Sequence, residues 1–241
     1  HKNLDFRRYS LREILDNQLE IADTVAASIR PVYEFKKYLY TGYYPFFMEY
    51  PETYHARLEQ VINLVLEMDI PAVKPINYES IGKLKKLLFI IATSAPFKPN
   101  IKKLSEKTGI GRNNIIQYLN YLDEANLLLL LHKDTYGISA LQKPEKIYLD
   151  NSNLMVALAY QDIDTGSLRE TFFVNQLREK HQVAYSEKSD FLVDNTYTFE
   201  VGGRNKTAKQ IAETKNAYLA LDDMEYGDEN KIPLWMFGFL Y

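Results

Sequence analysis

Hydrophobic positions recur every three or four residues over the first third of the chain, which is the spacing of helices with one buried face. The first such stretch runs from Leu11 to Ile29, and Ser10 with Glu13 three residues later predicts a capping box at its start. Arg30-Pro31 is expected to end this helix, because a proline disfavours helical backbone in the residue before it. A second stretch with the same spacing runs from Tyr54 to Met68.

The segment between these two helices is unusually aromatic, with seven aromatic residues in the thirteen positions from Tyr38 to Tyr50. One interpretation is a platform on which bases or sugars stack. The other is an elbow between helices that packs into the chain's own core, because aromatic side chains dominate core and interface burial. Few polar side chains alternate with these rings to supply recognition chemistry, which favours the elbow.

The middle of the chain has the spacing of a helix–turn–helix followed by two strands. Three helices are expected, at 81–91, 101–108 and 112–125. The short segment Gly109–Gly111 fits the tight turn between the last two helices. The leucine run 127–131 and the segment 146–149 are expected to form the two strands of a wing, with a polar tip at 132–137. This pattern predicts a winged helix-turn-helix.

The charges are segregated along the chain, so the net charge alone does not describe the surface that each part presents. The net charge is only −3, which by itself argues against a nucleic-acid binder. Residues 1–75 carry 9 basic and 11 acidic side chains, residues 76–147 carry 11 and 6, and residues 148–241 carry 9 and 15. Pro71 and Pro144 lie near the two limits. We therefore expect three units, which are a helical segment at 1–75, the winged helix at 76–147 and a further domain at 148–241.

The basic middle unit carries a surface suited to double-stranded DNA. Clustered lysines neutralise backbone phosphates, and amide side chains on an exposed helix can pair with adenine edges in the major groove. The residues expected to contact DNA are Lys98, Lys102, Lys103, Lys107, Arg112, Asn113, Asn114 and Gln117. The alternative is a solvated basic face on a winged helix that binds a partner protein.

The last third of the chain predicts an α+β domain with the order α-β-β-β-α-β. The elements are expected at 168–180, 182–186, 190–193, 197–201, 207–221 and 233–241. A three-residue loop at 194–196 pairs Phe191 with Phe199 and Val193 with Tyr197 on a buried face, and strand register follows such hydrophobic pairs.

The same register places Asp190 opposite Glu200, with both side chains on one face of the sheet. Two neighbouring carboxylates repel each other unless a cation or a proton joins them, so the pair is a candidate metal site. This arrangement, with Glu170 on the preceding helix, resembles the PD-(D/E)XK nucleases. The resemblance implies that Glu170, Asp190 and Glu200 hold Mg²⁺.

The resemblance also implies a lysine two residues after the second acid, where it orients or activates water. Gly202 occupies that position here, whereas Arg204 and Lys206 follow shortly after and could reach back. An arginine stays protonated, so it could stabilise phosphate charge but could not deprotonate water. The candidate catalytic residues are therefore Glu200, Arg204 and Lys206.

Blocks of sequence along nearly the whole chain resemble a class of bacterial and archaeal AAA+ ATPases. These blocks lie at 36–45, 96–101, 143–150, 169–173 and 199–203. In that class an ATPase module precedes a winged helix and a PD-(D/E)XK-like domain of uncertain function. The chain contains no Gly-x-x-x-x-Gly-Lys-Ser/Thr loop and does not begin with methionine. The resemblance therefore implies that ATP is bound by a module that precedes His1 in the same protein.

Two functions of different class are expected from these observations. The first is the recognition and regulatory region of an AAA+ ATPase, which binds DNA or a partner protein and contains an incomplete nuclease-like domain. The second is an Mg²⁺-dependent DNA endonuclease coupled to an ATPase module. The absence of cysteine excludes disulfides, a thiol nucleophile and iron–sulfur chemistry. Without an apolar run long enough for a membrane helix and without a secretory signal, a cytoplasmic protein with no membrane contact is expected.

Overall fold

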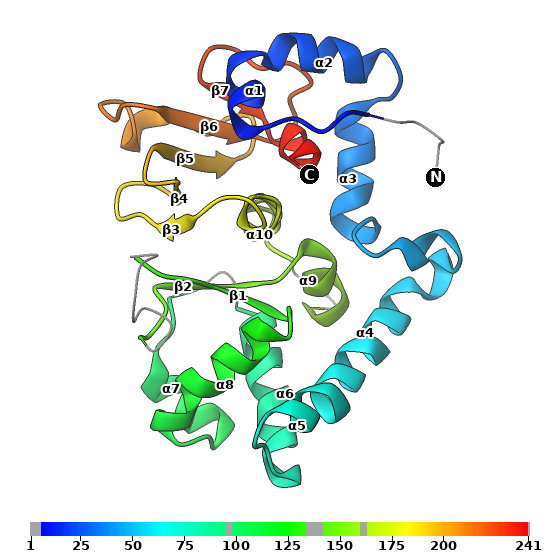
Figure 1. Cartoon of the computed structure of the whole chain (residues 1–241), viewed down its shortest axis with the longest axis vertical. Helices are drawn as coiled ribbons and strands as arrows, with labels where there is room; N and C mark the ends of the chain where they lie inside the picture. Colours follow the sequence, from blue (N-terminus) through cyan, green and yellow to red (C-terminus); the bar gives the residue numbers. More distant parts are fainter. Residues whose placement is uncertain (1–5, 95–97, 134–141, 160–162, 241) are drawn as a thin grey trace.

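The computed structural model of this 241-residue chain describes residues 6–94, 98–133, 142–159 and 163–240. These residues form ten α-helices, a two-stranded sheet and a five-stranded sheet. The protein is therefore of mixed α+β class. Figure 1 shows the small sheet with its helices at one end of the molecule and the large sheet at the other. None of the helices in these ranges is both long and apolar enough to cross a bilayer.

The first segment is helical, as predicted, but its first helix is broken. The capping box is confirmed, because Glu13 N–H donates to Ser10 Oγ at 3.2 Å and Ser10 N–H donates to the Glu13 carboxylate at 2.8 Å. The expected single helix to Ile29 is wrong, since α1 (Leu11–Asp16) and α2 (Gln18–Ala26) are separated at Asn17. Asparagine is a poor residue for a helix interior, which explains the break.

The rest of the first segment is a series of helices from Pro31 to Val73. Helix α3 (Pro31–Thr41), which the hydrophobic pattern did not predict, begins at the proline that was expected to end the preceding helix. The short 3₁₀ helices η1 (Pro45–Met48) and η2 (Pro51–Thr53) follow it. The second predicted helix is confirmed as α4 (Tyr54–Leu64). It continues through a π-helical turn, η3 (Val65–Asp69), into α5 (Ile70–Val73).

The aromatic segment packs against the rest of the chain, as the elbow interpretation predicts. Tyr38 meets Phe172 edge to face with 6.0 Å between ring centroids, and Tyr44 stacks on Phe46 at 5.8 Å. Tyr54 lies 5.1 Å from Phe46 and is fully buried. Tyr38, Tyr44, Phe46 and Phe47 thus pack against the core between the first helices and the last third of the chain, whereas Tyr40 and Tyr50 are exposed.

Buried Asn153 holds this elbow in place through its side-chain amide. The amide nitrogen donates to the carbonyl oxygens of Tyr38 at 3.0 Å and Leu39 at 2.9 Å. The amide oxygen accepts from Tyr43 N–H at 3.0 Å and from the Tyr54 hydroxyl. Burial raises the pKa of Tyr54 to about 12, so this hydroxyl stays a hydrogen-bond donor at neutral pH.

The middle of the chain has the predicted elements in the predicted order. These are α6 (Tyr78–Ala92), α7 (Ile101–Thr108), α8 (Arg112–Glu124), β1 (Leu128–Leu131) and β2 (Lys146–Leu149). Gly109 ends α7 with a φ of +72°, a left-handed conformation that favours glycine. Strands β1 and β2 pair antiparallel, with Leu128 opposite Leu149. Most of the expected wing tip lies outside the described residues.

The last third builds the large sheet. Its elements are α9 (Ser152–Ala159), α10 (Thr165–Arg178), β3 (Val183–Tyr185), β4 (Phe191–Val193), β5 (Tyr197–Gly202), β6 (Ala217–Leu221) and β7 (Lys231–Pro233). The strands lie in sequence order, with the first three antiparallel and the last three parallel. The predicted register is confirmed, because Phe191 pairs with Phe199 and Val193 with Tyr197.

The helix predicted at 207–221 is wrong. Only a 3₁₀ turn, η5 (Ala208–Gln210), lies there before the strand β6. Leu219 and Leu221 pack with Ile211 on one face of β6, whereas Tyr218 and Ala220 join the main core on the other. A strand buried on both faces reads as one apolar run, which periodicity does not distinguish from a buried helix.

The strand predicted at 233–241 is also wrong. Strand β7 ends at Pro233, and the 3₁₀ helix η6 (Leu234–Phe239) follows it. Proline has no N–H to continue the ladder of hydrogen bonds, which accounts for the end of the strand. After α10 the chain therefore forms the five strands of the large sheet, and a 3₁₀ turn between β5 and β6 stands in place of the expected second helix.

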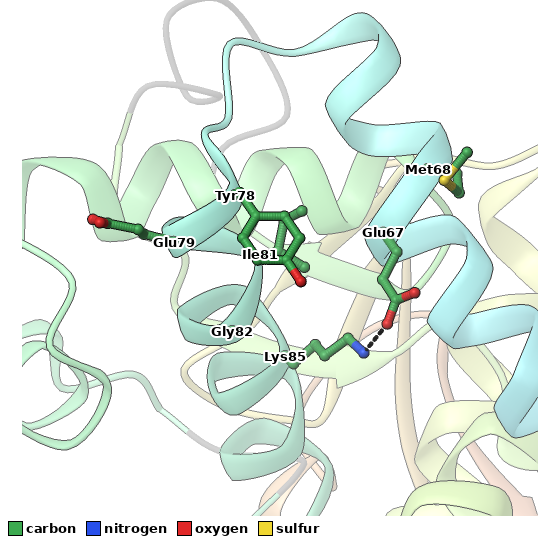
Figure 2. A pocket seen from close by; sticks show the side chains of 7 residues that line it. All are labelled: Glu67, Met68, Tyr78, Glu79, Ile81, Gly82 and Lys85. Carbon is green, nitrogen blue, oxygen red and sulfur yellow. Dashed lines mark hydrogen bonds and ion pairs between the residues drawn. The ribbon is translucent and has the colours of Figure 1, made fainter.

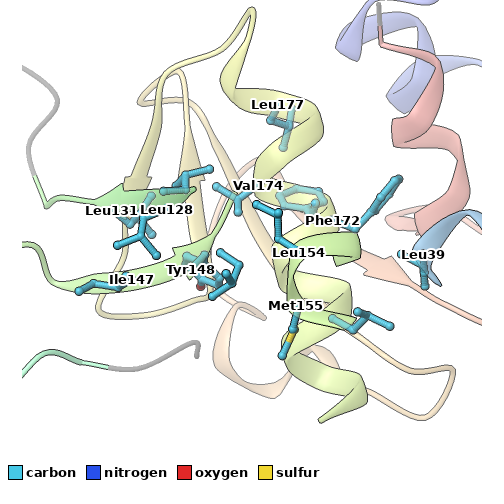
Figure 3. Packing of buried hydrophobic residues seen from close by; sticks show 14 of the residues in the cluster. Leu39, Leu128, Leu131, Ile147, Tyr148, Leu154, Met155, Phe172, Val174 and Leu177 are labelled. Carbon is cyan, nitrogen blue, oxygen red and sulfur yellow. The ribbon is translucent and has the colours of Figure 1, made fainter. Parts of the chain in front are cut away.

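One hydrophobic core joins all three parts of the chain. Figure 3 shows Leu39 of the first segment, Leu128 and Ile147 of the small sheet, and Leu154 and Phe172 of the last third in one cluster. All five are at most 3% exposed. The division of the chain into three functional units stays a prediction, and these units share a core.

Candidate acid–lysine site

Asp190, Glu200 and Lys206 come together beside β4 and β5. Asp190 directly precedes β4, Glu200 lies in β5, and Lys206 lies in the turn after β5. Lys206 Nζ is 3.1 Å from Asp190 Oδ2 and 2.5 Å from Glu200 Oε2. Asp190 Oδ2 also accepts a hydrogen bond from Val201 N–H at 2.8 Å. The predicted pair of acids thus faces one lysine.

Glu200 is a buried carboxylate whose partners are incomplete. It is 1% exposed, and neither of its side-chain oxygens accepts a well-aligned hydrogen bond from the described residues. Its contact with Lys206 is therefore an ion pair in which the N–H groups are not well aligned for a hydrogen bond. Burial, followed by repulsion from Asp190, raises the pKa of Glu200, and the Lys206 ammonium opposes this rise. A buried carboxylate with unfilled lone pairs suits a cation.

Lys206 reaches the two acids by lying across Gly202. A Cβ placed on Gly202 would meet the Cδ of Lys206 at 2.8 Å and its Cβ at 2.9 Å. The aliphatic part of Lys206 therefore fills the space that a side chain at position 202 would take. This explains how a glycine at the expected lysine position is compatible with a lysine in the site.

The surroundings of Lys206 keep it charged. Burial by itself would lower the pKa of this ammonium, but its contacts with Glu200 and Asp190 outweigh burial, and the pKa is raised. Lys206 is therefore a stable cation at neutral pH. It can stabilise negative charge, but it does not act as a base there.

Glu170, the third predicted metal ligand, is engaged elsewhere. Its Oε2 accepts a hydrogen bond from the Tyr148 hydroxyl at 2.8 Å and from Lys146 Nζ at 2.7 Å. Burial, and next the charge of Glu170, raises the pKa of Tyr148 far above its ordinary value. Among the residues that the structure describes, no three His, Cys, Asp or Glu side chains are grouped closely enough to hold one metal ion.

The sequence pattern did not predict the partners of Glu170. Lys146 and Tyr148 alternate on β2, and their spacing of two places both on one face of the strand. That spacing is the sequence signal from which the two partners of Glu170 could have been predicted. Of the remaining candidates, Arg204 is exposed, and in the described ranges it forms no ion pair with Asp190 or Glu200.

A second ion pair fixes the turn that carries Lys206. Arg169 Nε donates to Asp222 Oδ2 at 2.8 Å, and both side chains are largely buried. Asp222 N–H in turn donates to the carbonyl of Gly202 at 2.9 Å, which ties the ends of β5 and β6 together. The guanidinium lies close above Gly203. These contacts hold the start of the turn between Gly202 and Lys206.

The predicted DNA-contacting residues lie on the exposed faces of α7 and α8. Lys102, Lys103 and Lys107 are exposed on α7, and Arg112, Asn113, Asn114 and Gln117 are exposed on α8. Lys98, in the loop before α7, is also exposed, and its Nζ donates to the hydroxyl of Tyr185 at 2.8 Å. Lys98 therefore links the basic unit to the large sheet.

Several hollows mark the surface of the described residues, and three of them differ in character. One of about 400 Å³ is polar and includes Asp190. Another of about 790 Å³ is mainly apolar and is lined by the aromatic segment with Phe172 and Trp235. Figure 2 shows the third, of about 570 Å³, between η3 and α6, where Lys85 pairs with Glu67 and Tyr78 is one of the lining residues. Of the three, only the polar hollow is lined by a residue of the acid–lysine site.

Comparisons with known proteins define a family. The model of a family described as a domain of unknown function (DUF8612) matches residues 32–165, which is more than half of the chain, so the chain belongs to this family. An uncharacterized protein of the archaeon Methanocaldococcus jannaschii is 24% identical over 253 aligned residues. The alignment covers 96% of this chain and 54% of that relative, so the chain spans about half of its length. No solved structure is significantly similar to the chain.

Proposed function

We propose that this chain binds DNA through its basic middle unit and cleaves phosphodiester bonds with the help of Mg²⁺ at Asp190, Glu200 and Lys206. The observation that carries the proposal is the position of Lys206, whose side chain replaces the one absent at Gly202 and brings an ammonium to both acids. With this lysine, the acid–acid–lysine set expected of a PD-(D/E)XK-like site is complete.

Asp190 and Glu200 would hold the metal ion. The fit rests on Glu200, a buried carboxylate whose Oε1 has no partner among the described residues and whose Oε2 contacts the Lys206 ammonium, because carboxylate oxygens are the ligands that Mg²⁺ prefers. A bound Mg²⁺ polarises a phosphodiester and lowers the pKa of a coordinated water. Glu170, held by Lys146 and Tyr148, would support the wall of the site and would not be a ligand.

Lys206 would act by charge. Its raised pKa keeps it protonated at neutral pH, so it would stabilise the negative charge that develops on the phosphate and orient the attacking water. The contact of Asp190 with Val201 N–H fixes the carboxylate that holds the ammonium on one side. The buried Glu200 holds it on the other.

The middle unit supplies the affinity for DNA in this proposal. Its three helices and two-stranded wing are interpreted as a winged helix, in which α8 enters the major groove and the lysines of α7 contact phosphates. The amide side chains of Asn113, Asn114 and Gln117 would read base edges. Their exposure on one helix supports this assignment.

The relation to AAA+ ATPases is a proposal that rests on the resemblance of sequence blocks. The chain would be the region that follows the ATPase module, and ATP hydrolysis there would control access of DNA to the site. A recognition region without catalysis is the alternative, and it is favoured by the engagement of Glu170, which leaves two acids for a metal. The coding sequence upstream of His1 tests the assignment, because the proposal requires a phosphate-binding loop there.

Cleavage of labelled DNA tests the proposed activity. The chain, with Mg²⁺ or Mn²⁺, is expected to cut a fluorescent DNA substrate, and Asp190→Asn or Glu200→Gln is expected to reduce the rate by about 100-fold or more. Glu213→Gln is the matched control, since Glu213 is exposed and lies outside the site. Absence of cutting by the wild type with either metal, or a Glu200→Gln variant as fast as the wild type, would overturn the proposal.

A further inference from the structure

The polar hollow beside Asp190 is lined by four different parts of the chain. Lys98 comes from the loop before α7, Lys146 from β2, and the remainder comes from the segment 185–190 and Gln210. Its volume of about 400 Å³ lies at the lower end of the range for ligand pockets and suits a group the size of one nucleotide. The hollow therefore joins the basic middle unit to the acid–lysine site.

The charges of the hollow do not cancel. Three of its charged residues already have partners of opposite charge, because Lys146 pairs with Glu170, Asp190 with Lys206, and Glu187 with Lys133. Two lysines remain. Among the described residues, neither Lys98 nor Lys188 forms an ion pair by direct contact. Lys98 donates to the neutral phenol of Tyr185, and Glu145 and Glu187 attract it more weakly. Two lysines without a direct carboxylate contact thus line one cavity.

Hydroxyl groups accompany these two lysines. Ser186, Ser189 and Tyr185 line the same hollow. The Ser189 hydroxyl donates to the Phe191 carbonyl at 3.2 Å, and the hydroxyls of Ser186 and Tyr185 are suited to donate to phosphate oxygens. The contact with Tyr185 raises the pKa of Lys98, so its charge is retained at neutral pH. Ammonium and hydroxyl donors around a small cavity are the groups that bind a phosphate.

We infer that this hollow binds a phosphate group of the DNA strand that enters the acid–lysine site, with Lys98 and Lys188 as its cationic ligands. The inference rests on the proposed function and extends it, since it gives the winged-helix loop a direct part in positioning the strand. DNA held by α7 and α8 would then continue past Lys98 to Asp190. The phosphate bound in the hollow is a neighbour of the one that reacts.

Binding without metal tests this inference separately from catalysis. Affinity for a short fluorescein-labelled duplex is measured by fluorescence anisotropy in EDTA, where no Mg²⁺-dependent cutting occurs. Lys98→Glu and Lys188→Glu are each expected to weaken binding about tenfold and to lower the slope of log K against log salt by about 0.9 for each phosphate that the variant no longer neutralises. Lys215→Glu, an equal charge change at an exposed site outside the hollow, is expected to change affinity less than about twofold.

The position of the bound phosphate is read from two probes. A preference for a 5′-phosphorylated strand over a 5′-hydroxyl strand, abolished in Lys188→Glu, assigns the hollow to a strand end. Equal affinity for the two strands, with weaker binding of both in Lys188→Glu, assigns the hollow to an internal phosphate. Both outcomes support the inference. Charge-reversal variants that bind like the wild type, or a Lys215→Glu variant weakened as much as they are, would overturn it.

The inference and the proposed function can fail independently. If the chain never cuts DNA but loses affinity in Lys98→Glu and Lys188→Glu, the phosphate site stands and the proposed cleavage does not. If the wild type cuts DNA and both variants cut with unchanged affinity and rate, the cleavage stands and the phosphate site does not. Lys98→Ala and Lys188→Ala repeat the test with a smaller change, and a melting curve of each variant confirms folding.

Discussion

The side chain of Lys206 crosses the α-carbon of Gly202, so closely that a Cβ at position 202 would lie 2.8 Å from Lys206 Cδ. The two positions therefore share one space. Only one of them can carry a side chain that enters the site without a shift of the other. A glycine at 202 and a lysine at 206 are thus two parts of one arrangement, in which the ammonium arrives from the turn after β5.

The stability of the fold is expected to depend on the protonation of Glu200. Because its pKa is raised above the ordinary value of 4.5, the folded chain holds this proton more tightly than the unfolded chain. The contribution of Glu200 to stability is then greatest below pH 4.5 and is lost as the pH rises through the folded pKa. Urea unfolding at a series of pH values should show a smaller loss of stability over this window in Glu200→Gln. Parallel profiles for the variant and the wild type would contradict the assignment.

Mg²⁺ is expected to stabilise the fold through the two acids. A ligand that binds only the folded state at ten times its Kd adds about 1.4 kcal/mol to the free energy of unfolding. Thermal unfolding with increasing Mg²⁺ should therefore raise the Tm of the wild type, and EDTA should reverse the rise. Asp190→Asn should abolish it, whereas the exposed control Glu213→Gln should retain it. A rise of equal size in Asp190→Asn would place the metal elsewhere.

The aromatic elbow is expected to depend on Asn153. Replacing this buried side chain by alanine leaves carbonyls of α3, the Tyr43 N–H and the Tyr54 hydroxyl without their partner. Each buried polar group left unpaired costs about 1–3 kcal/mol, so Asn153→Ala should lose at least about 2 kcal/mol in urea unfolding. Asn113→Ala on exposed α8 is the matched control and should change stability by less than about 0.5 kcal/mol. Equal losses in the two variants would contradict this role.

DNA binding is expected to require the lysines of α7. The double variant Lys102→Glu/Lys103→Glu places two acids where phosphates would lie, so it should abolish the electrophoretic shift of duplex DNA. The control variant Lys215→Glu/Lys231→Glu makes the same charge change at two exposed residues beside and in the large sheet, and it should keep the shift. A shift that survives in the first variant, or that disappears equally in both, would argue for a protein partner at α7 and α8.

The parts of this molecule that the sequence predicts well are those in which local pattern and final contacts agree. Phe191 and Phe199 face each other because both are apolar, and that pairing fixes the register that brings Asp190 to Glu200. The helices around Gly109 follow from periodicity and from a residue that tolerates positive φ.

Other features depend on contacts between distant segments. The segment 217–221 is equally compatible with a helix and with a strand, and its pairing with β5 decides the outcome. The engagement of Glu170 depends on β2, which lies more than 20 positions earlier in the chain. The position of the Lys206 side chain over Gly202 depends on the path of the turn between them. A motif that expects the lysine two residues after Glu200 does not predict that path.

Moving the lysine is the most direct test of the central claim that Lys206 replaces a lysine at position 202. Metal-dependent cleavage of DNA is measured for the wild type, Lys206→Gly and Gly202→Lys/Lys206→Gly. Glycine is used at position 206 because a Cβ at position 202 would meet the Cβ of residue 206 at 2.9 Å. We expect a loss of about 100-fold in Lys206→Gly and a recovery of at least about tenfold in the double variant, because removal of the whole side chain of Lys206 frees the space over position 202. A Lys206→Gly variant that cuts as fast as the wild type, or a folded double variant that recovers nothing, would contradict the claim.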